Sequence, residues 1–423
     1  MRHHLIRRLE ALLCTGAPGL YRVITFFAVQ HIYSLAELGH TASSMAIAQM
    51  AAFFTAIGWA ALILVRVPGA ANGQAAVDAF YPLVSMAALT TIVVTLGSIA
   101  LALTNLVSFD LWAFVLLLWG WTAYQVARHY FVAHKRYRIA VIFDLGLITG
   151  SGLSLWLCER SGLSSSCGLA IALGVTAGAM FVSIGTPSHG VRLTGFDVKG
   201  LQFGLTNFLS GGIALVFIPA ATLMCGASFS GMLSLLASVT AVGLLLPRAI
   251  SMAQLPELAK RKSAKLPLND MLHAMRRNIG WSNGVVLAIN VLLVVGLASW
   301  QMREGAERVT VIFAGALLAV QCAVGVMGMV NSSVMMAFEK GAQAARVNVV
   351  TTAAFAALFA FCAWYGGQNG FLLVLASSIG VTILRNRLIR TCAIGVCDAY
   401  ASQSTGPNSD EMPISPSAHG PAR

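Results

Sequence analysis

Residues 128–144 read RHYFVAHKRYRIAVIFD, a basic cluster between two apolar runs that ends on a single acidic residue. A basic turn between two apolar runs is typical of two membrane helices whose connecting loop is held on one side. Asp144 comes six residues into the second run, too deep for an ordinary loop residue. The stretch therefore predicts a helical hairpin, and it requires a partner or a polar surrounding for the carboxylate.

The composition of the whole chain agrees with a membrane protein. Of 423 residues, 57% are hydrophobic and 10% are charged, with a mean hydropathy of +0.78. A soluble globular protein carries about 25% charged residues, so too few charges remain here for a water-facing surface. The net charge of +12 would suggest nucleic acid in a soluble protein. In a membrane protein it indicates basic loops, and no nucleic-acid partner is expected.

Apolar runs of about 20 residues predict an all-α polytopic protein with about twelve transmembrane helices. The predicted spans are 11–33, 43–65, 80–104, 109–131, 139–157, 166–185, 200–222, 228–247, 279–299, 309–330, 347–366 and 370–392. With these spans, 23 of the 27 Lys and Arg residues fall on the side of both termini, and three fall on the other. The positive-inside rule then places both termini in the cytoplasm.

Two segments recur along the chain. The Leu-Gly turn at Gly39 has a counterpart at Gly226, an offset of 187, and an offset of 204 aligns Asp144 with Asn348. Two six-helix halves that start on the same side are predicted, as in transporters whose substrate site lies between repeats. We expect an N-terminal lobe at 1–190, a C-terminal lobe at 191–396 and a disordered Pro/Ser-rich cytoplasmic tail at 397–423.

Four segments of the sequence carry a resemblance to a known superfamily. They are GLYRVITFFAVQHIYSLAELGHTASSMAIAQM (19–50), YFVAHKRYRIAVIFDLG (130–146), LLLPRAISMAQLPELAKRKSA (244–264), and MMAFEKGAQAARVNVV (335–350) with WYGGQNGFLLVLASSIGVTI (364–383). Over residues 10–392 the chain resembles the multidrug/oligosaccharidyl-lipid/polysaccharide (MOP) exporters, and within them the polysaccharide flippases of the Wzx kind. The resemblance implies a V-shaped, two-lobed fold with alternating access. It also implies the bacterial inner membrane and an anionic lipid-linked sugar as substrate.

The candidate substrate-binding residues lie in or next to the predicted spans. Arg22 is about 16 Å into the first span at 1.5 Å per residue, so it needs a watery cavity or a partner. Its guanidinium matches a pyrophosphate, and a structural ion pair is the alternative. Asp144 is expected to pair with Arg22 or to line a cavity between the lobes. For Asn348 a hydrogen bond between helices competes with a binding role.

Arg128 and Arg136 belong to the predicted cytoplasmic loop. Their charge suits the topology of the loop and attraction to lipid headgroups, and a funnel for lipid pyrophosphate is the sharper alternative. Cys158 and Cys167 bracket a short external loop, where a disulfide and two free thiols both remain open. Neither a metal-ligand spacing nor a GxxxxGK[ST] phosphate loop is present, so no metal or other cofactor is expected.

Several functions remain open at this point. The first is a flippase for polyprenyl-pyrophosphate oligosaccharides in surface polysaccharide synthesis, with membrane lipids around it and a polymerase or glycosyltransferases as partners. The second is a drug or metabolite exporter coupled to protons or sodium, with Asp144 as the coupling carboxylate. A membrane-embedded polymerase, ligase or glycosyltransferase, or a scaffold without transport, is a further alternative. The chain has neither a large external loop nor DxD-like acidic pairs, so an enzyme is not expected.

Overall fold

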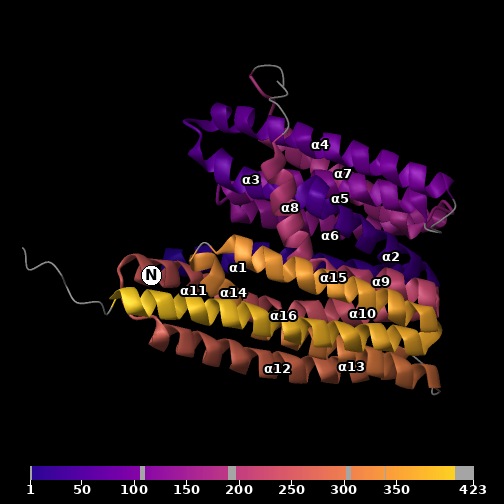
Figure 1. The fold of residues 1–423 in the computed structure, drawn as a ribbon. Coiled ribbons are helices and arrows are strands. Elements are labelled where there is room, and N and C mark those ends of the chain that lie inside the picture. Colours follow the sequence, from indigo (N-terminus) through magenta and orange to yellow (C-terminus); the bar gives the residue numbers. More distant parts are fainter. Residues whose placement is uncertain (1, 105–109, 189–196, 302–305, 339, 405–423) are drawn as a thin grey trace, which may run out of the picture.

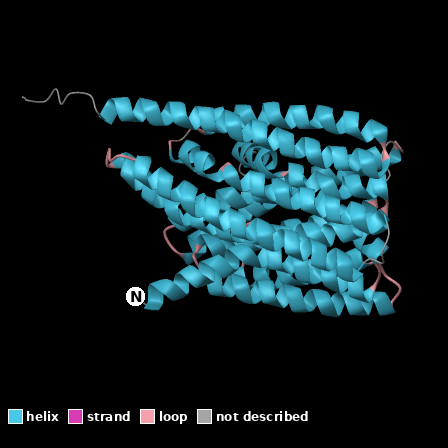
Figure 2. Ribbon diagram, turned by 90° about the horizontal axis from the view of Figure 1, so that it is seen from below, coloured by secondary structure: helices cyan, strands magenta, loops and turns pink. Residues whose placement is uncertain are grey.

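The structure is a computed structural model that describes the chain except residues 1, 105–109, 189–196, 302–305, 339 and 405–423. Within the described residues the chain is helical, with no strand, and most of the long helices run along a common direction (Figure 2), while α8 (Val198–Gly211) crosses them at a steep angle (Figure 1). The elements are α1 (Arg2–Ile32), α2 (Leu35–Ala52), η1 (Phe53–Ile57), α3 (Gly58–Arg66), η2 (Val67–Gly69), α4 (Gly73–Leu103), α5 (Leu111–Ala133), α6 (Tyr137–Arg160), α7 (Ser165–Ile184), α8 (Val198–Gly211), α9 (Ile213–Cys225), α10 (Ala227–Gly243), α11 (Leu245–Ser263), α12 (Asn269–Gln301), α13 (Ala306–Met327), α14 (Met329–Ala337), α15 (Gly341–Tyr365) and α16 (Gly367–Ser404).

The predicted hairpin at 128–144 is confirmed as α5 and α6. Asp110 begins α5 as an N-cap, because its side chain accepts a hydrogen bond from the backbone N–H of Ala113 at 3.0 Å. The turn after α5 reverses at Lys135, which has a φ of 56°, in the left-handed region that ends many helices. The short turn makes α5 and α6 antiparallel neighbours, so residues near its two sides come close together.

Each of the twelve predicted spans overlaps one or more helices, but the helices differ in length and polarity. Among the described residues, eight helices are long and apolar enough to cross a membrane, and the bent pair of α8 and α9 makes nine. The other three predicted spans are in α1, α5 and α10. The first two carry buried polar groups, and α10 has 17 residues, which is short for a span.

The seventh predicted span, 200–222, is broken. Its two parts, α8 and α9, are bent by 65° around Gly212. In Figure 1, α8 lies with α3–α7, whereas α9 lies with α10–α16. A Cβ atom on Gly204 would be 2.3 Å from the carbonyl oxygen of Phe53, so only glycine permits this close packing of α8 on η1. The lobe boundary between residues 190 and 191 stays a prediction. Although α8 comes after this boundary in the sequence, it packs on helices of the first half.

The two halves of the chain meet where α2 packs along α10. A Cβ on Gly39 would be 1.9 Å from the carbonyl oxygen of Ala227, and one on Gly231 would be 2.0 Å from that of Leu35. Backbone therefore touches backbone across the interface, as small residues allow in membrane helices. The contact lies near the first residues of α2 and α10, at the end of the bundle remote from the first turn of α1.

The predicted disordered tail, 397–423, is wrong for its first eight residues, because α16 continues to Ser404. The physical reason is an apolar stripe at four-residue spacing, Cys392, Val396 and Tyr400, which packs on α11 and α14. The Tyr400 ring lies edge-on to the ring of Phe338, 5.5 Å between centroids. The rest of the predicted tail lies outside the described residues.

Candidate functional site

The aspartate that ends the basic stretch is bound to the arginine that begins it. Arg128 Nε donates to Asp144 Oδ1 at 3.0 Å and to Oδ2 at 3.2 Å, and Arg128 Nη2 donates to Oδ2 at 3.0 Å. The Tyr124 hydroxyl donates to Oδ1 at 2.5 Å. Tyr124 and Arg128 are four residues apart and so share one face of α5, opposite Asp144 on α6.

Both members of this ion pair are buried, with 5% of Arg128 and 1% of Asp144 exposed. The prediction that Asp144 pairs with Arg22 is therefore wrong, and so is the assignment of Arg128 to the loop. The reason is that α5 reaches Ala133 before the chain turns. Arg128 thus lies more than one helical turn inside the helix, where it needs a counterion.

Arg128 also ties α1 to this pair, because its Nη2 donates to the carbonyl oxygen of Cys14. That carbonyl would normally accept from the N–H four residues later, at position 18. Position 18 is Pro18, which has no N–H to give. The proline leaves an unsatisfied carbonyl inside α1, and the guanidinium of α5 satisfies it. Three helices, α1, α5 and α6, are held together by one arginine.

Asp144 lies in the wall of a cavity of about 440 Å³. Three neighbouring faces contribute to it, namely α1 and α6 from the first half and the region from α10 to α12 from the second. Its lining residues are Leu13, Gly16, Ala17, Leu20, Val141, Asp144, Leu145, Ile148, Gly243, Leu246 and Val286. Among these described residues Asp144 alone is charged, and its carboxylate is already bonded to Arg128 and Tyr124. The cavity between the halves is thus apolar in character.

Arg22 is the second arginine of the interior, and it faces away from this cavity. It follows Leu13 by nine residues, which is two and a half turns at about 3.6 residues per turn, so the two lie on opposite faces of α1. The guanidinium carbon is 5.3 Å from the ring centre of Phe26. Its Nε is buried without a hydrogen-bond partner. No carboxylate pairs with Arg22 within the described part of the chain.

The remaining predicted site residues lie apart from this cluster. Asn348, 4% exposed on α15, accepts a hydrogen bond from Arg385 Nε of α16 at 2.7 Å. The expected contact between helices is confirmed for Asn348, although its partner is an arginine that the sequence did not single out. Arg136 is exposed in the turn before α6. Cys158 and Cys167, the two cysteines that bracket the turn between α6 and α7, are free thiols.

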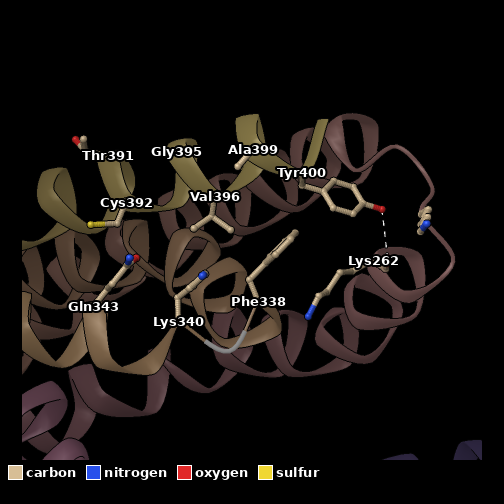
Figure 3. A pocket seen from close by; sticks show the side chains of 11 residues that line it. Lys262, Phe338, Lys340, Gln343, Thr391, Cys392, Gly395, Val396, Ala399 and Tyr400 are labelled. Atoms are coloured by element: carbon tan, nitrogen blue, oxygen red, sulfur yellow. Dashed lines mark hydrogen bonds between the residues drawn. The ribbon is translucent and has the colours of Figure 1, made fainter. Parts of the chain in front are cut away.

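The second half has a basic cavity of about 790 Å³ between α11, α15 and α16 (Figure 3). Lys262, Lys265 and Lys340 line it together with Phe338 and Tyr400. Lys262 is already engaged, since its Nζ donates to the carbonyl of Ala337 at 3.1 Å and lies 5.3 Å from the ring of Phe338. In the described residues, no three His, Cys, Asp or Glu side chains gather as a metal site would require.

The sequence matches no protein-family profile and no curated protein. The fold does match solved structures. An inward-facing multidrug resistance MATE transporter of the MOP superfamily superposes with a TM-score of 0.65 at 12% identity, over 94% of this chain and 99% of that one. A eukaryotic MATE transporter, AtDTX14, gives 0.63 at 15% identity over 94% and 99%. An outward-facing MATE transporter of the MOP superfamily gives 0.56 at 12% identity over 94% and 96%.

These similarities define the class of the fold. The protein has the helical polytopic membrane fold of MATE transporters, which belong to the MOP superfamily. The TM-score is higher against the inward-facing example than against the outward-facing one.

Proposed function

We propose that this protein is an alternating-access transporter that moves an anionic lipid-linked substrate, a polyprenyl-pyrophosphate oligosaccharide, across the bacterial inner membrane. The fold similarity supports transport in general, and it fits a drug exporter equally well. The choice between a flippase and a drug exporter rests on one observation, the hydrogen bonding of the Asp144 carboxylate. A coupling carboxylate has to exchange a proton or a cation during transport, whereas Asp144 is held by Arg128 and Tyr124 through hydrogen bonds to both oxygens.

The charge balance of the interior supports an anionic substrate. The charges of Arg128 and Asp144 cancel, and Arg22 contributes a positive charge without a carboxylate partner among the described residues. An unpaired charge inside a membrane protein is expensive unless it meets water or a ligand of opposite sign. Guanidinium recognises phosphate oxygens through paired hydrogen bonds, so a pyrophosphate fits this requirement. The apolar cavity beside Asp144 lies on the opposite face of α1 from Arg22, so the pyrophosphate assignment rests on Arg22 alone.

The positive-inside count supports the direction of transport that we propose. With both termini in the cytoplasm, the apolar cavity beside Asp144 lies in the cytoplasmic half of the protein, on the side where lipid-linked sugars are assembled. The closed contact of Gly39 with Ala227 then lies on the external side. Alternating access would separate α2 from α10 there. A polymerase or glycosyltransferases acting on the same glycan are the partners we expect.

The test uses a strain that lacks the gene and carries wild-type protein, Arg22→Ala or Arg138→Ala. Lipid-linked glycans are identified by mass spectrometry, and their sidedness is probed with a membrane-impermeant enzyme. We expect Arg22→Ala to reduce the outward-facing fraction about tenfold, the effect of losing one charge-assisted hydrogen bond. Arg138 is exposed at the start of α6 and serves as the matched control, for which wild-type transport is expected.

Three results would contradict the proposal. An unchanged pool of lipid-linked glycan in the deletion strain would remove the substrate assignment. Loss of ion-coupled efflux of a cationic dye in Asp144→Asn, with the protein still folded, would favour the exporter instead. Shortened glycans would indicate an enzyme.

A further inference from the structure

A second basic cavity, of about 410 Å³, lies in the second half where α12, α13, α14 and α16 meet. Three arginines line it, Arg276 from α12 and Arg387 and Arg390 from α16. The two on α16 are three residues apart and so share one face of the helix. None of the residues that line this cavity in the described chain is acidic, and the described ion pairs involve none of the three arginines.

A hydrogen bond joins two of the helices that line this cavity. Asn386 Nδ2 donates to the carbonyl of Val324 at 2.6 Å, which fixes α16 to the end of α13. The chain breaks between α13 and α14 at Gly328, where a Cβ would be 2.2 Å from Asn386 Oδ1. Glycine is therefore needed to let the amide of Asn386 reach the backbone. Arg387, which lines the cavity, directly follows Asn386 on α16.

The cavity is built from two kinds of surface. Apolar side chains of Val324, Met327, Val330 and Ile383 form one part of its wall, and the arginines form the other. Met327 is 65% exposed and Ile383 is 40% exposed. On the outside of a membrane bundle, exposed apolar side chains face acyl chains. The cavity thus joins a lipid-facing surface to a cluster of positive charge.

The depth of the arginines matches the membrane interface. Arg276 comes three residues before the predicted span 279–299, and Arg390 lies two residues before the end of the predicted span 370–392. Both predicted ends are on the side of the chain termini, where anionic headgroups attract basic clusters. We propose that this cavity binds the phosphate headgroup of an anionic phospholipid, with Arg276, Arg387 and Arg390 as its ligands and the apolar wall along its acyl chains.

The occupant follows from charge and shape. Guanidinium groups bind phosphate oxygens in pairs, and basic pockets between membrane helices on the cytoplasmic side bind phospholipid headgroups. A free phosphate would use the arginines but not the apolar wall. A zwitterionic lipid would use the wall but leave three positive charges only partly balanced. The inference concerns a site separate from Asp144 and Arg22, so it does not depend on the proposed transport function.

The test measures lipid binding to purified full-length protein. The protein is delipidated in mild detergent and titrated with phosphatidylglycerol, phosphatidylcholine or inorganic phosphate, and native mass spectrometry counts the bound molecules. We compare wild type with R276Q, R387Q, R390Q and the triple variant. Arg277 is the matched control, because it is exposed and adjacent to Arg276 but does not line the cavity.

We expect wild type to bind phosphatidylglycerol more tightly than phosphatidylcholine. Each single variant should lose about fivefold in affinity for phosphatidylglycerol, and the triple variant at least about tenfold, whereas R277Q stays within about twofold. The single variants keep the test decisive if the triple variant does not fold. Equal binding of the two lipids, or wild-type affinity in R276Q, R387Q and R390Q, would overturn the proposal. Inorganic phosphate binding as tightly as the lipid would overturn the assignment to a phospholipid.

Discussion

The two halves of the molecule each bury one polar residue against an arginine, but they do so in different ways. In the first half Asp144 of α6 binds Arg128 of α5, and in the second half Asn348 of α15 binds Arg385 of α16. The offset of 204 relates Asp144 to Asn348, whereas the same offset from Arg128 leads to Ser332. The acceptor position is repeated, and the arginine that meets it comes from a different helix in each half.

The difference in charge separates the two pairs. Arg128 and Asp144 neutralise each other, so their burial leaves no net charge. Asn348 is neutral, so the positive charge of Arg385 remains, and this side chain is only partly buried. A fully buried arginine requires a carboxylate, whereas a partly exposed one is satisfied by an amide and surrounding water. The depth of the arginine therefore decides whether the acceptor has to be charged.

The largest effect is expected when this requirement is broken in the first half. In Asp144→Ala, Arg128 stays buried without its counterion, which costs about 3–5 kcal/mol. We expect a large loss of protein that elutes as a single species after extraction in detergent, and a lower midpoint of thermal unfolding. Size-exclusion chromatography and circular dichroism measure the two quantities.

A matched substitution separates charge from hydrogen bonding. Asp144→Asn makes the first half resemble the second, because an amide oxygen still accepts from Arg128. We expect it to be more stable than Asp144→Ala and less stable than wild type. Equal stability of Asp144→Asn and wild type would mean that the counterion is dispensable at this depth.

A smaller effect is expected in the second half. Asn348→Ala removes one hydrogen bond from Arg385, and hydrogen bonds between membrane helices contribute about 0.6–1.7 kcal/mol. We expect a loss in this range, measured by titration of bicelle-embedded protein with a denaturing detergent. Asn348→Asp is the informative counterpart, since it gives Arg385 a carboxylate and should restore at least the stability of wild type. A destabilisation by Asn348→Asp as large as by Asn348→Ala would show that Arg385 does not pair there.

The positions of the helices followed from the sequence because apolar runs of membrane length have few alternative structures. The site followed only in part. The depth of Asp144 and its need for a partner were correctly predicted, and the repeat pointed to Asn348. The identity of the partner was missed, since Arg128 stands in a basic cluster that resembles a topological loop. Arg128 and Asp144 are 16 positions apart and meet only because the turn at Lys135 reverses the chain. The hydropathy of the sequence does not show which residues such a turn brings together.

One local signal in the sequence, Pro18, could have pointed to the site. A proline inside a membrane helix frees the carbonyl four residues before it, and a nearby donor has to satisfy that group. Here the carbonyl belongs to Cys14 and the donor is Arg128. The carbonyl group that the proline leaves free therefore binds Arg128 of α5 to α1, and the ion pair with Asp144 binds the same arginine to α6.

The smallest effect is expected from Pro18→Ala, which tests this link. Alanine supplies the missing N–H, so the Cys14 carbonyl gains a donor within α1 and depends less on Arg128. The removal of proline favours the helix, while Arg128 keeps Asp144 and Tyr124 as partners. The net change in stability should therefore be small, and the informative quantity is the coupling between Pro18→Ala and Arg128→Lys. We expect about 0.6 kcal/mol of coupling in a double-mutant cycle, because the lysine change should cost less once alanine is present. If the stability changes of the two substitutions are strictly additive, the hydrogen bond from Arg128 to α1 contributes nothing measurable. The arginine of the first half would then stabilise a contact between two helices only, as Arg385 does in the second half.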